Sequence, residues 1–472
     1  MIIGRKKEIM KLNDALKNER SCFIAVYGRR RIGKTFLVRE TYDNRFTFQH
    51  AGVSGGSMQD QLTAFGASLK EAGFETDSKP NTWAEAFEAL KDLIRQSTER
   101  KKIVFIDELS WMDTPKSNLV QALESFWNGW ASARKDIVLI ICASATSWML
   151  SKVIHNKGGL YNRLTDQIHL DSFSLAECEE YICARGLNMT RNQILQYYMI
   201  FGGVPYYWTF LQKGLSLPQN IDHILFARDA PLKEEYRYLY ASVFKHPEGY
   251  LKIVRALGKK KAGMTREELV ETTKLSNSGD LTTKLEELES CGFIRRYNAF
   301  GMKKKNSVYQ LMDCFTLFYY RFLEENPSDE QFWTNQINMP KVNTWMGLAF
   351  ERVCLMHVKQ MKHKLGISGV LTEVNSWYCK ADPEKGIFGS QIDLLLVRKD
   401  QVINLCEMKY SNTEYTITEK TDRSIRHKIS DLIISTGTRY AIYPTLVTTY
   451  GITDNAWSSN MQSVITVDDL FV

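Results

Sequence analysis

The sequence predicts a multidomain α/β protein that begins with a parallel α/β domain. Three observations lead to this prediction. The chain has 472 residues, too many for one hydrophobic core and typical of about three domains. A glycine-rich motif follows an apolar, β-prone run near the N-terminus, and two β-prone runs that carry carboxylates occur in the last third. The predicted segments are an α/β core at 1–172, a helical lid at 173–230, a helix and hairpin segment at 231–326, and a second α/β domain at 327–472.

The composition is that of an ordinary soluble protein, with 44% hydrophobic and 24% charged residues. The chain is charged from its start, and no run approaches the length of a membrane span, so we expect a cytoplasmic protein without a membrane partner. Nine cysteines are scattered without a Cys-x2-Cys pair and read as reduced core residues. The net charge of +7 suits an anionic partner, but it serves solubility equally well.

The first element is the stretch from Gly28 to Thr35, which fits the pattern Gly-x4-Gly-Lys-[Ser/Thr]. An apolar run at 22–27 precedes it and a helical run at 36–40 follows, which is the order that a phosphate-binding loop requires. In such a loop Lys34 reaches the β- and γ-phosphates of ATP and Thr35 holds Mg²⁺. The loop residues that we assign to the nucleotide are Gly28, Arg31, Gly33, Lys34 and Thr35.

Two further β-prone runs end in polar residues. The run at 102–106 leads into Asp107 and Glu108, and the run at 136–143 leads into Ser144. Because ligands bind beyond the carboxyl ends of parallel strands, we expect Asp107 to complete the Mg²⁺ site and Glu108 to polarise the attacking water. The two acids also fit an ordinary surface turn. Ser144 fits either a contact with the γ-phosphate or the cap of a following helix.

These motifs, together with Gly4-Arg-x2-Glu8, Gly158-Gly-Leu-Tyr-Asn-Arg163 and Gly202-Gly-Val-Pro205, resemble the archaeal-type ATPases of the STAND branch of the AAA+ superfamily. The resemblance covers essentially the whole chain and implies a C-terminal domain of unknown function. It implies that Gly4, Arg5 and Pro205 lie near the base and that Ser144 is a polar sensor. Arg163 is then a nucleotide-state sensor or a trans-acting arginine, as in a nucleotide-dependent homo-oligomer. From the residues alone, a solvated charge in a glycine-rich loop is the alternative for Arg163, and we favour the nucleotide role.

The segment at 231–326 has the pattern of a winged helix-turn-helix, with three short helices and then a hairpin. Its basic loop, Lys303, Lys304 and Lys305, is the predicted DNA contact. The third helix carries Asp280, Glu286, Glu287 and Glu289 against one Lys284, and these acids would repel phosphates. We therefore favour packing or autoinhibition over sequence reading for this helix.

The last third contains a hairpin that turns near 399–401. This turn puts Asp393 opposite Glu407, where side chains lie about 5 Å apart, close enough to share a divalent cation. Lys409 lies on the same face as Glu407 by strand alternation, and a helix upstream supplies Glu351. Two carboxylates and a lysine form a site for activating water on a phosphodiester. The alternative is a surface hairpin with chance charges.

An Asp followed by Glu-x-Lys after a hairpin resembles the PD-(D/E)xK restriction-endonuclease-like fold, with Ile392 in place of the proline. The resemblance implies the active-site set Glu351, Asp393, Glu407 and Lys409, with Mg²⁺ or Mn²⁺ held by Asp393 and Glu407. The sequence thus predicts a switch that binds and hydrolyses ATP and controls a metal-dependent DNA nuclease site, with ATP or ADP and DNA as its partners. The alternative is a regulatory or signalling ATPase that binds DNA or a protein and whose nuclease-like domain is not catalytic.

Overall fold

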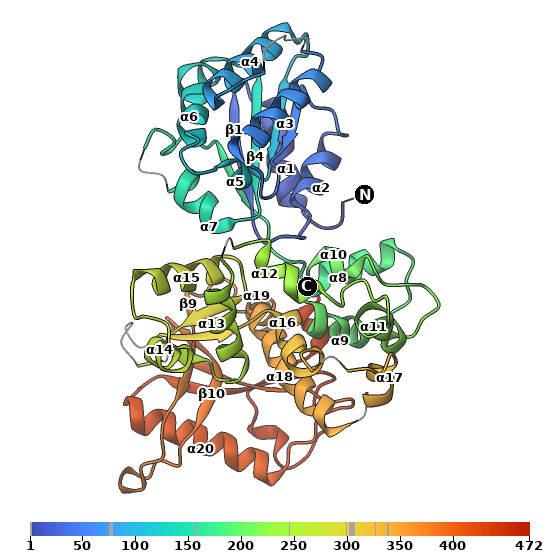
Figure 1. The fold of residues 1–472 in the computed structure, drawn as a ribbon. Helices are drawn as coiled ribbons and strands as arrows, with labels where there is room; N and C mark the ends of the chain where they lie inside the picture. The colour runs from blue at the N-terminus through green and yellow to red at the C-terminus, as the bar shows by residue number, and fades with distance from the viewer. Residues whose placement is uncertain are drawn as a thin grey trace. The chain divides into compact units, whose positions relative to one another are not determined.

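A computed structural model describes residues 2–74, 79–155, 158–244, 246–298, 300–301, 307–325, 327–337 and 339–472. The chain folds as two compact units, Met1–Ser172 and Phe173–Val472. Each unit has its own sheet and its own covering helices (Figure 1). The predicted boundaries at residues 230 and 326 fall inside the second unit and stay predictions.

The first unit is built on a parallel sheet of five strands in the order β2-β3-β4-β1-β5. Its strands are β1 (Cys22–Tyr27), β2 (Phe48–Ala51), β3 (Lys102–Asp107), β4 (Ile137–Ala143) and β5 (Asp166–His169). The central strands β1 and β4 are apolar along their whole length because both of their faces are covered by helices. All five strands run in one direction, so their carboxyl ends meet at one edge.

Helices cover both faces of this sheet. They are α1 (Lys6–Lys17), α2 (Lys34–Thr41), α3 (Met58–Glu71), α4 (Trp83–Gln96), α5 (Leu109–Met112), α6 (Leu119–Gly129) and α7 (Thr146–Met149). One core joins the sheet to α3, α4 and α6 through aromatic side chains such as Phe65, Phe87 and Phe126. The other core joins the opposite face to α1 and α2 through Leu12 and Leu37. The sheet with its helices is the parallel α/β architecture typical of P-loop ATPases.

The second unit begins with helices and contains two sheets. Its helices are α8 (Leu175–Ala184), α9 (Arg191–Phe201), α10 (Pro205–Trp208), α11 (Leu217–Leu225), α12 (Glu235–Ala241), α13 (Glu248–Gly258), α14 (Arg266–Thr273), α15 (Gly279–Ser290), α16 (Cys314–Phe318), α17 (Phe332–Gln336), α18 (Pro340–Met356), α19 (Val358–Lys364) and α20 (Glu419–Thr436). Its strands are β6 (Met264–Thr265), β7 (Ile294–Tyr297), β8 (Val308–Leu311), β9 (Thr372–Tyr378), β10 (Gln391–Arg398), β11 (Val402–Lys409), β12 (Ala441–Thr448) and β13 (Ser463–Ile465).

We call residues 248–311 the middle segment. It contains α13, α14 and α15 and an antiparallel sheet in the order β6-β8-β7. Thr265 begins α14 with a capping box to Glu268, as the sequence suggests. Lys303, Lys304 and Lys305 lie outside the described residues, so their predicted contact with DNA stays a prediction.

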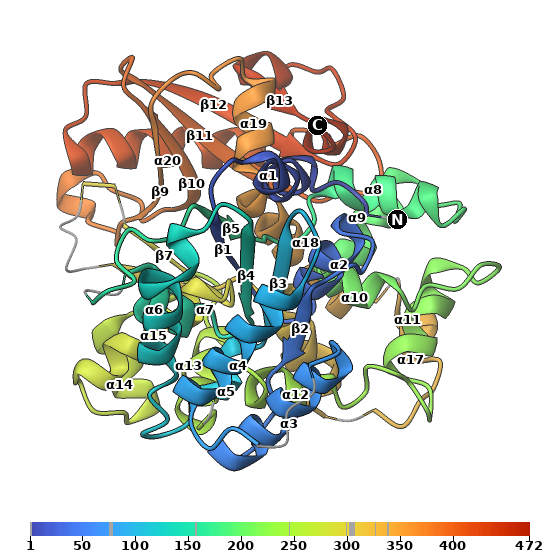
Figure 2. The same cartoon turned by 90° about the horizontal axis from the view of Figure 1, so that it is seen from above.

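The second sheet is mixed, with the order β13-β12-β11-β10-β9. Strands β9, β10 and β11 are antiparallel neighbours, whereas β12 runs parallel to β11 and is reached through α20. Leu432 of α20 packs with Leu395 and Leu405 in the core of one face. Helix α20 lies beside strands β9 and β10 of this sheet (Figure 2). Helix α18 contacts β11 and places its buried Glu351 beside the sheet.

A β-bulge interrupts β10 next to the predicted active-site aspartate. Ile392 pairs with Trp377 and Leu395 pairs with Asn375, so β10 has one more residue than β9 between these pairs. Asp393 lies inside this irregularity. A bulge ends the regular alternation of side chains and redirects the residue it contains, and bulges are common beside active sites.

The helices of the second unit are too short or too polar to form a bilayer span, and the same holds for every other helix in the described ranges.

Candidate functional site

Two glycines give the loop between β1 and α2 its shape. Gly28 has a φ of 139°, and a Cβ at this position would lie 2.4 Å from the carbonyl oxygen of Leu170. Gly33 has a φ of 88° and stands immediately before the first turn of α2. Both backbone conformations strain any residue with a Cβ, so the tight loop requires glycine at each position.

Lys34 is buried at the mouth of this loop. Its ammonium donates to the carbonyl oxygens of Gly28 and Arg29, at 2.9 and 3.0 Å, and to the hydroxyl of Ser144 at 3.0 Å. The charge is therefore held at the edge where the strands end, among backbone and hydroxyl groups. A phosphate arriving there meets a positioned cation and the positive end of a helix.

Thr35 and Asp107 lie together although they come from different elements. The hydroxyl of Thr35, in the first turn of α2, donates to a carboxylate oxygen of Asp107 at 2.5 Å, and Asp107 ends β3. The other carboxylate oxygen accepts the backbone N–H of Glu108 at 2.9 Å. A hydroxyl and a carboxylate at this edge are oxygen donors of the kind that Mg²⁺ binds, so the residues fit this ion.

Glu108 has a left-handed backbone conformation, with a φ of 47°. Its carboxylate accepts the hydroxyl of Ser144 at 2.5 Å and the backbone N–H of Ser144 at 3.1 Å. Strained backbone of this kind concentrates at functional sites, where surrounding contacts stabilise it. Ser144 contacts both Glu108 and Lys34 and does not cap α7, which has Ala145 at its N-cap and no side-chain cap.

The remaining predicted nucleotide residues occupy loops. Gly4 and Arg5 are left-handed before α1, and the buried Arg5 guanidinium donates to the carbonyl of Asp171 at 2.6 Å. Arg31 is left-handed in the glycine-rich loop, and Arg163 is exposed in the segment before β5. In the second unit, Pro205 is the first residue of α10.

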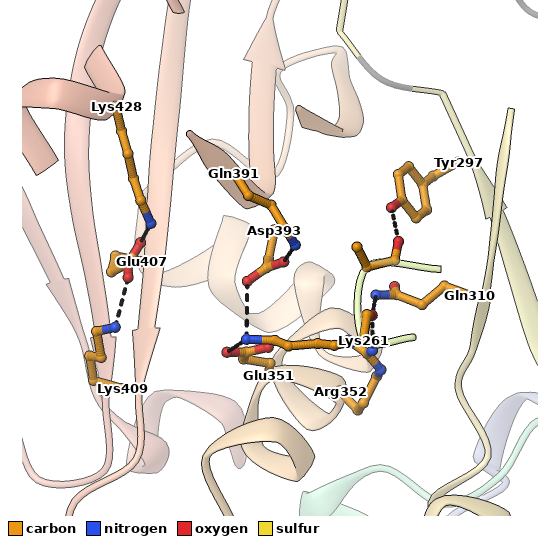
Figure 3. A network of polar contacts seen from close by, with 11 residues as sticks. Lys261, Tyr297, Gln310, Glu351, Arg352, Gln391, Asp393, Glu407, Lys409 and Lys428 are labelled. Carbon is orange, nitrogen blue, oxygen red and sulfur yellow. Dashed lines mark hydrogen bonds and ion pairs between the residues drawn. The ribbon is translucent and has the colours of Figure 1, made fainter. Parts of the chain in front are cut away.

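The second candidate centre lies in the second unit, where the acid from α18 faces the acid from β10. The ammonium of Lys261 lies 2.6 Å from Oε1 of Glu351 and 3.8 Å from Oδ2 of Asp393 (Figure 3). Gln391 donates to the other oxygen of Asp393 at 2.7 Å. Burial is the largest cause that raises the pKa of Glu351, and the nearby charge of Asp393 raises it further.

Glu407 and its partners form the other half of this centre. Glu407 pairs with Lys409 at 2.8 Å, two residues on along β11, and with Lys428 of α20 at 2.6 Å. Burial acts to raise the pKa of Glu407, but Lys428 and Lys409 outweigh it and hold this pKa below its ordinary value. Burial acts to lower the pKa of Lys409. The negative charge of Glu407 and, more weakly, that of Glu351 outweigh burial, so the pKa of Lys409 is raised above its ordinary value.

The two acids of the hairpin have separate partners. Leu394 pairs with Cys406, so the register brings Asp393 and Glu407 to the same end of the ladder, but a cation shared by the two acids stays a prediction. At this end the Asp393 side chain is directed to Lys261 and Gln391, and the Glu407 side chain to Lys409 and Lys428 (Figure 3). Across the described part of the chain, no three His, Cys, Asp or Glu side chains are grouped as a metal site.

The basic side chains in the first half of α20 are largely paired with other groups of the protein. Arg426 pairs with Asp422, and Arg423 pairs with Glu419. The ring of His427 stacks on Phe388 with centroids 3.9 Å apart. These contacts favour a structural role for this face of the helix.

Comparisons with known proteins identify the first domain. Residues 2–209 match a family described as an ATPase domain predominantly from Archaea. Residues 2–209 form an ATPase domain of archaeal type. Residues 317–424 match a second family, described as archaeal and bacterial proteins of unknown function. Nucleotide binding by the first domain follows from its family.

Several known proteins are similar to this chain over most of its length. An uncharacterized protein of Methanocaldococcus jannaschii is 25% identical over 435 residues, which cover 91% of this chain and 92% of that protein. A Walker-type ATPase of Pyrococcus abyssi has a TM-score of 0.46 at 16% identity, covering 68% of this chain and 96% of that one. The ORC2 protein of Aeropyrum pernix, solved with ADPNP and ADP, has a TM-score of 0.40 at 14% identity, covering 71% and 95%.

Two lysines of the second centre were not predicted from the sequence. Lys261 lies in a run of lysines after α13, and Lys428 belongs to a helix with many charges. Neither has a motif around it. The one available signal was the pair of partly apolar strands carrying Asp393 and Glu407, since buried carboxylates require cationic or metal partners.

Proposed function

We propose that this protein is an ATP-controlled, divalent-cation-dependent DNA nuclease. The first unit binds and hydrolyses ATP, and the centre formed by α18, β10 and β11 cuts the phosphodiester. We also propose that the middle segment is a winged helix. The mixed sheet is proposed to belong to a PD-(D/E)xK fold.

One observation carries the nuclease part of the proposal. Glu351, Asp393, Glu407 and Lys409 come from three different elements, yet they belong to two neighbouring groups of ion pairs at one end of the β10–β11 hairpin (Figure 3). The Lys409 ammonium is within electrostatic reach of both Glu407 and Glu351. Each buried carboxylate costs desolvation energy, so a centre that keeps several of them near one another is a candidate functional site.

The site fits a divalent cation on the evidence of its own atoms. Oε2 of Glu351 is buried and has no hydrogen-bond partner among the residues that the structure describes. Such an atom is a ready ligand for Mg²⁺ or Mn²⁺, and Asp393 supplies further carboxylate oxygens. A divalent cation bound there supplies Lewis-acid activation of water and of the scissile phosphate.

The residues of the chain then divide the work. Glu351 and Asp393 hold the cation, Gln391 orients Asp393, and Glu407 keeps the Lys409 ammonium in place. Burial lowers the pKa of Lys409, but the charge of Glu407 more than offsets this effect, so the ammonium stays charged at neutral pH. A positioned ammonium stabilises the negative charge that develops on the phosphate in the transition state.

The ATPase part rests on the edge of the first sheet. Lys34 would hold the β- and γ-phosphates, while Thr35 and Asp107 would hold Mg²⁺. Glu108 would orient and polarise the attacking water. The Ser144 hydroxyl donates to Glu108, and it would couple the presence of the γ-phosphate to the position of this carboxylate. Gly4, Arg5, Arg31, Arg163 and Pro205 are proposed as further nucleotide contacts.

A second candidate function is favoured by the ion pairs of the C-terminal centre. Each of its acids is paired with a lysine or lies close to one. Such a centre also suits a regulatory ATPase whose C-terminal part binds DNA or a protein without cutting.

Cleavage of single-stranded, linear and supercoiled DNA with Mg²⁺ or Mn²⁺ separates the two functions. The nuclease predicts cutting that requires the cation and disappears in Asp393→Ala. Asp400→Ala is the matched control, because Asp400 lies in the turn of the same hairpin and pairs with Arg398 away from the centre. DNA binding with no cutting under any cation, in a protein that still hydrolyses ATP, would move the assignment to the regulatory ATPase.

A further inference from the structure

Lys261 reaches the C-terminal centre from the middle segment, and its ammonium is the cation closest to Glu351. The nitrogen lies 2.6 Å from Oε1 of Glu351 and 3.8 Å from Oδ2 of Asp393. One positive charge thus faces two carboxylates, the pair that would hold the divalent cation of the proposed nuclease. The ammonium and a divalent cation compete for the space between these acids, because two positive charges at such short range repel each other.

The backbone of Lys261 is fixed while its side chain is not enclosed. Its carbonyl oxygen accepts from the guanidinium of the buried Arg352 at 2.6 Å and from the amide of Gln310 at 2.8 Å. The Tyr297 hydroxyl donates to the next carbonyl, that of Ala262, at 2.5 Å (Figure 3). The Lys261 side chain is nevertheless 48% exposed. It can therefore leave the acids by rotation about its own bonds, without movement of the loop.

A cavity of about 660 Å³ adjoins Glu351 and offers a second position for this ammonium. Lys261 and Glu351 both line it, and Tyr320 and Trp345 supply aromatic surface. Its other cationic side chains are Arg255, Lys259 and Arg321. Arg255 is paired with Glu324. The net charge of the residues that line the cavity is nevertheless positive. Arginine and lysine side chains with neighbouring aromatic rings are the usual surroundings of nucleic-acid phosphates and bases.

We propose that Lys261 blocks the cation position between Glu351 and Asp393 until a phosphate group of DNA enters the adjoining cavity and draws the ammonium away. The proposal rests on the proposed nuclease and adds its regulation: the centre binds its divalent cation only when substrate is present. No bond forms or breaks in this exchange. The carboxylates give up a monovalent partner for a divalent one, and the lysine gains a phosphate.

The proposal concerns cation binding, so it is tested without cleavage. Free Mn²⁺ is titrated by electron paramagnetic resonance into the full-length protein at pH 8 without nucleotide, and Asp393→Asn gives the background. Lys261→Met should bind Mn²⁺ roughly tenfold more tightly than the wild type, in the range of ordinary coupling between two ligands. Lys261→Arg keeps the charge and should bind no more tightly than the wild type.

The neighbouring lysine provides a matched control. Lys260→Met removes the same charge one residue earlier, where the side chain pairs with Glu268 instead. Its affinity for Mn²⁺ should equal that of the wild type. Thermal unfolding of each variant verifies that the second unit remains folded.

A DNA duplex with phosphorothioate linkages, which resist hydrolysis, tests the second half of the proposal. After subtraction of Mn²⁺ bound by the duplex alone, the duplex should raise the Mn²⁺ affinity of the wild type. The duplex should raise the Mn²⁺ affinity of Lys261→Met much less, because the cation position of this variant is already unblocked. The increase should also be small for the double variant Lys259→Met with Arg321→Met, because its cavity has lost two positive charges.

The outcomes are distinguishable. The proposal is supported if Lys261→Met binds Mn²⁺ more tightly than the wild type. It also requires that the duplex raises the Mn²⁺ affinity only in proteins that retain Lys261 and the cavity charges. Equal, measurable affinity in the wild type and Lys261→Met overturns the block and leaves the nuclease intact. Binding that never exceeds the Asp393→Asn background in any variant contradicts the block and the metal-dependent nuclease together.

Discussion

The ammonium of Lys261 lies 2.6 Å from a carboxylate oxygen of Glu351, although the two residues are 90 positions apart in the chain. This contact joins the loop after α13 to the middle of α18. Because Glu351 is buried, the contact supplies part of the charge compensation that the carboxylate lost with its water. It also links the middle segment to the centre proposed to cut DNA.

ATP hydrolysis should depend on Glu108 separately from ATP binding. Glu108→Gln keeps the size of the side chain but removes the carboxylate that polarises water, so turnover should fall about 10²–10⁴-fold, the usual contribution of a general base. Binding should persist, because Lys34 and Thr35 remain. Steady-state hydrolysis and the binding of a fluorescent ATP analogue measure the two effects.

Glu99→Gln is the matched control for this prediction, since Glu99 is an exposed acid between α4 and β3. It should leave both measurements unchanged. If Glu108→Gln turned ATP over at the wild-type rate, another group would have to activate the water.

The two glycines of the phosphate loop should differ in what they contribute to stability. Gly28→Ala puts a Cβ 2.4 Å from the Leu170 carbonyl oxygen, at a φ of 139°, so the backbone must move. In Gly33→Ala the new Cβ has no atom within 4 Å. The strain of a φ of 88° should therefore be its only effect, a loss of about 1 kcal/mol in the free energy of unfolding. We expect Gly28→Ala to cost more than about 3 kcal/mol, the range of steric clashes in packed regions.

Thermal unfolding of the first unit without nucleotide measures the difference. Gly28→Ala should lower the melting temperature well below that of Gly33→Ala, whereas both should weaken ATP binding. Equal melting temperatures would show that the loop relaxes around the new Cβ at Gly28.

Stability around Glu407 should depend on pH in a defined direction. Its pKa in the folded protein lies below the ordinary value of 4.5, because Lys428 and Lys409 outweigh the effect of burial. The unfolded chain therefore binds its proton first as the pH falls, and the stabilisation by charged Glu407 is complete above pH 4.5 and lost as the pH drops through the folded pKa. Glu407→Gln should remove about 1–3 kcal/mol at pH 7, the cost of leaving a buried partner unpaired.

Amide hydrogen exchange in β10 and β11 measures this free energy locally. The difference between Glu407→Gln and wild type should shrink as the pH falls from 7 to below 4. Glu419→Gln, in an exposed pair with Arg423, should change exchange by less than about 0.5 kcal/mol at any pH. A difference that stayed constant over this range would contradict an ionised Glu407.

Local sequence patterns were sufficient for much of the first unit. The glycine spacing around Lys34 and the acids after an apolar run place Thr35 and Asp107 at one edge, because parallel strands force their carboxyl ends together. The structure has these residues in contact, and the domain family agrees with an ATPase. The role of Ser144 was left open between two alternatives, since a hydroxyl after a strand serves either one.

The second centre was less predictable because its geometry depends on distant residues. Strand alternation correctly puts Lys409 beside Glu407. A β-bulge, however, has no sequence signature in β10, and it redirects Asp393 to Lys261 and Gln391. Lys261 approaches through tertiary contacts of its backbone with Arg352 and Gln310, which no local pattern reveals.

ATP bound to the first unit is proposed to control cutting by the second, and the DNA cleavage rate with ATP, with ADP and without nucleotide measures this control. We predict that the wild-type rates with ATP and ADP differ at least about tenfold, as in ordinary allosteric coupling. Lys34→Ala should cut at one rate in all three conditions, and Lys91→Ala, which removes a lysine paired with Glu88 on α4, should behave like the wild type. Cleavage by the wild type at the same rate with ATP, with ADP and without nucleotide would contradict the account.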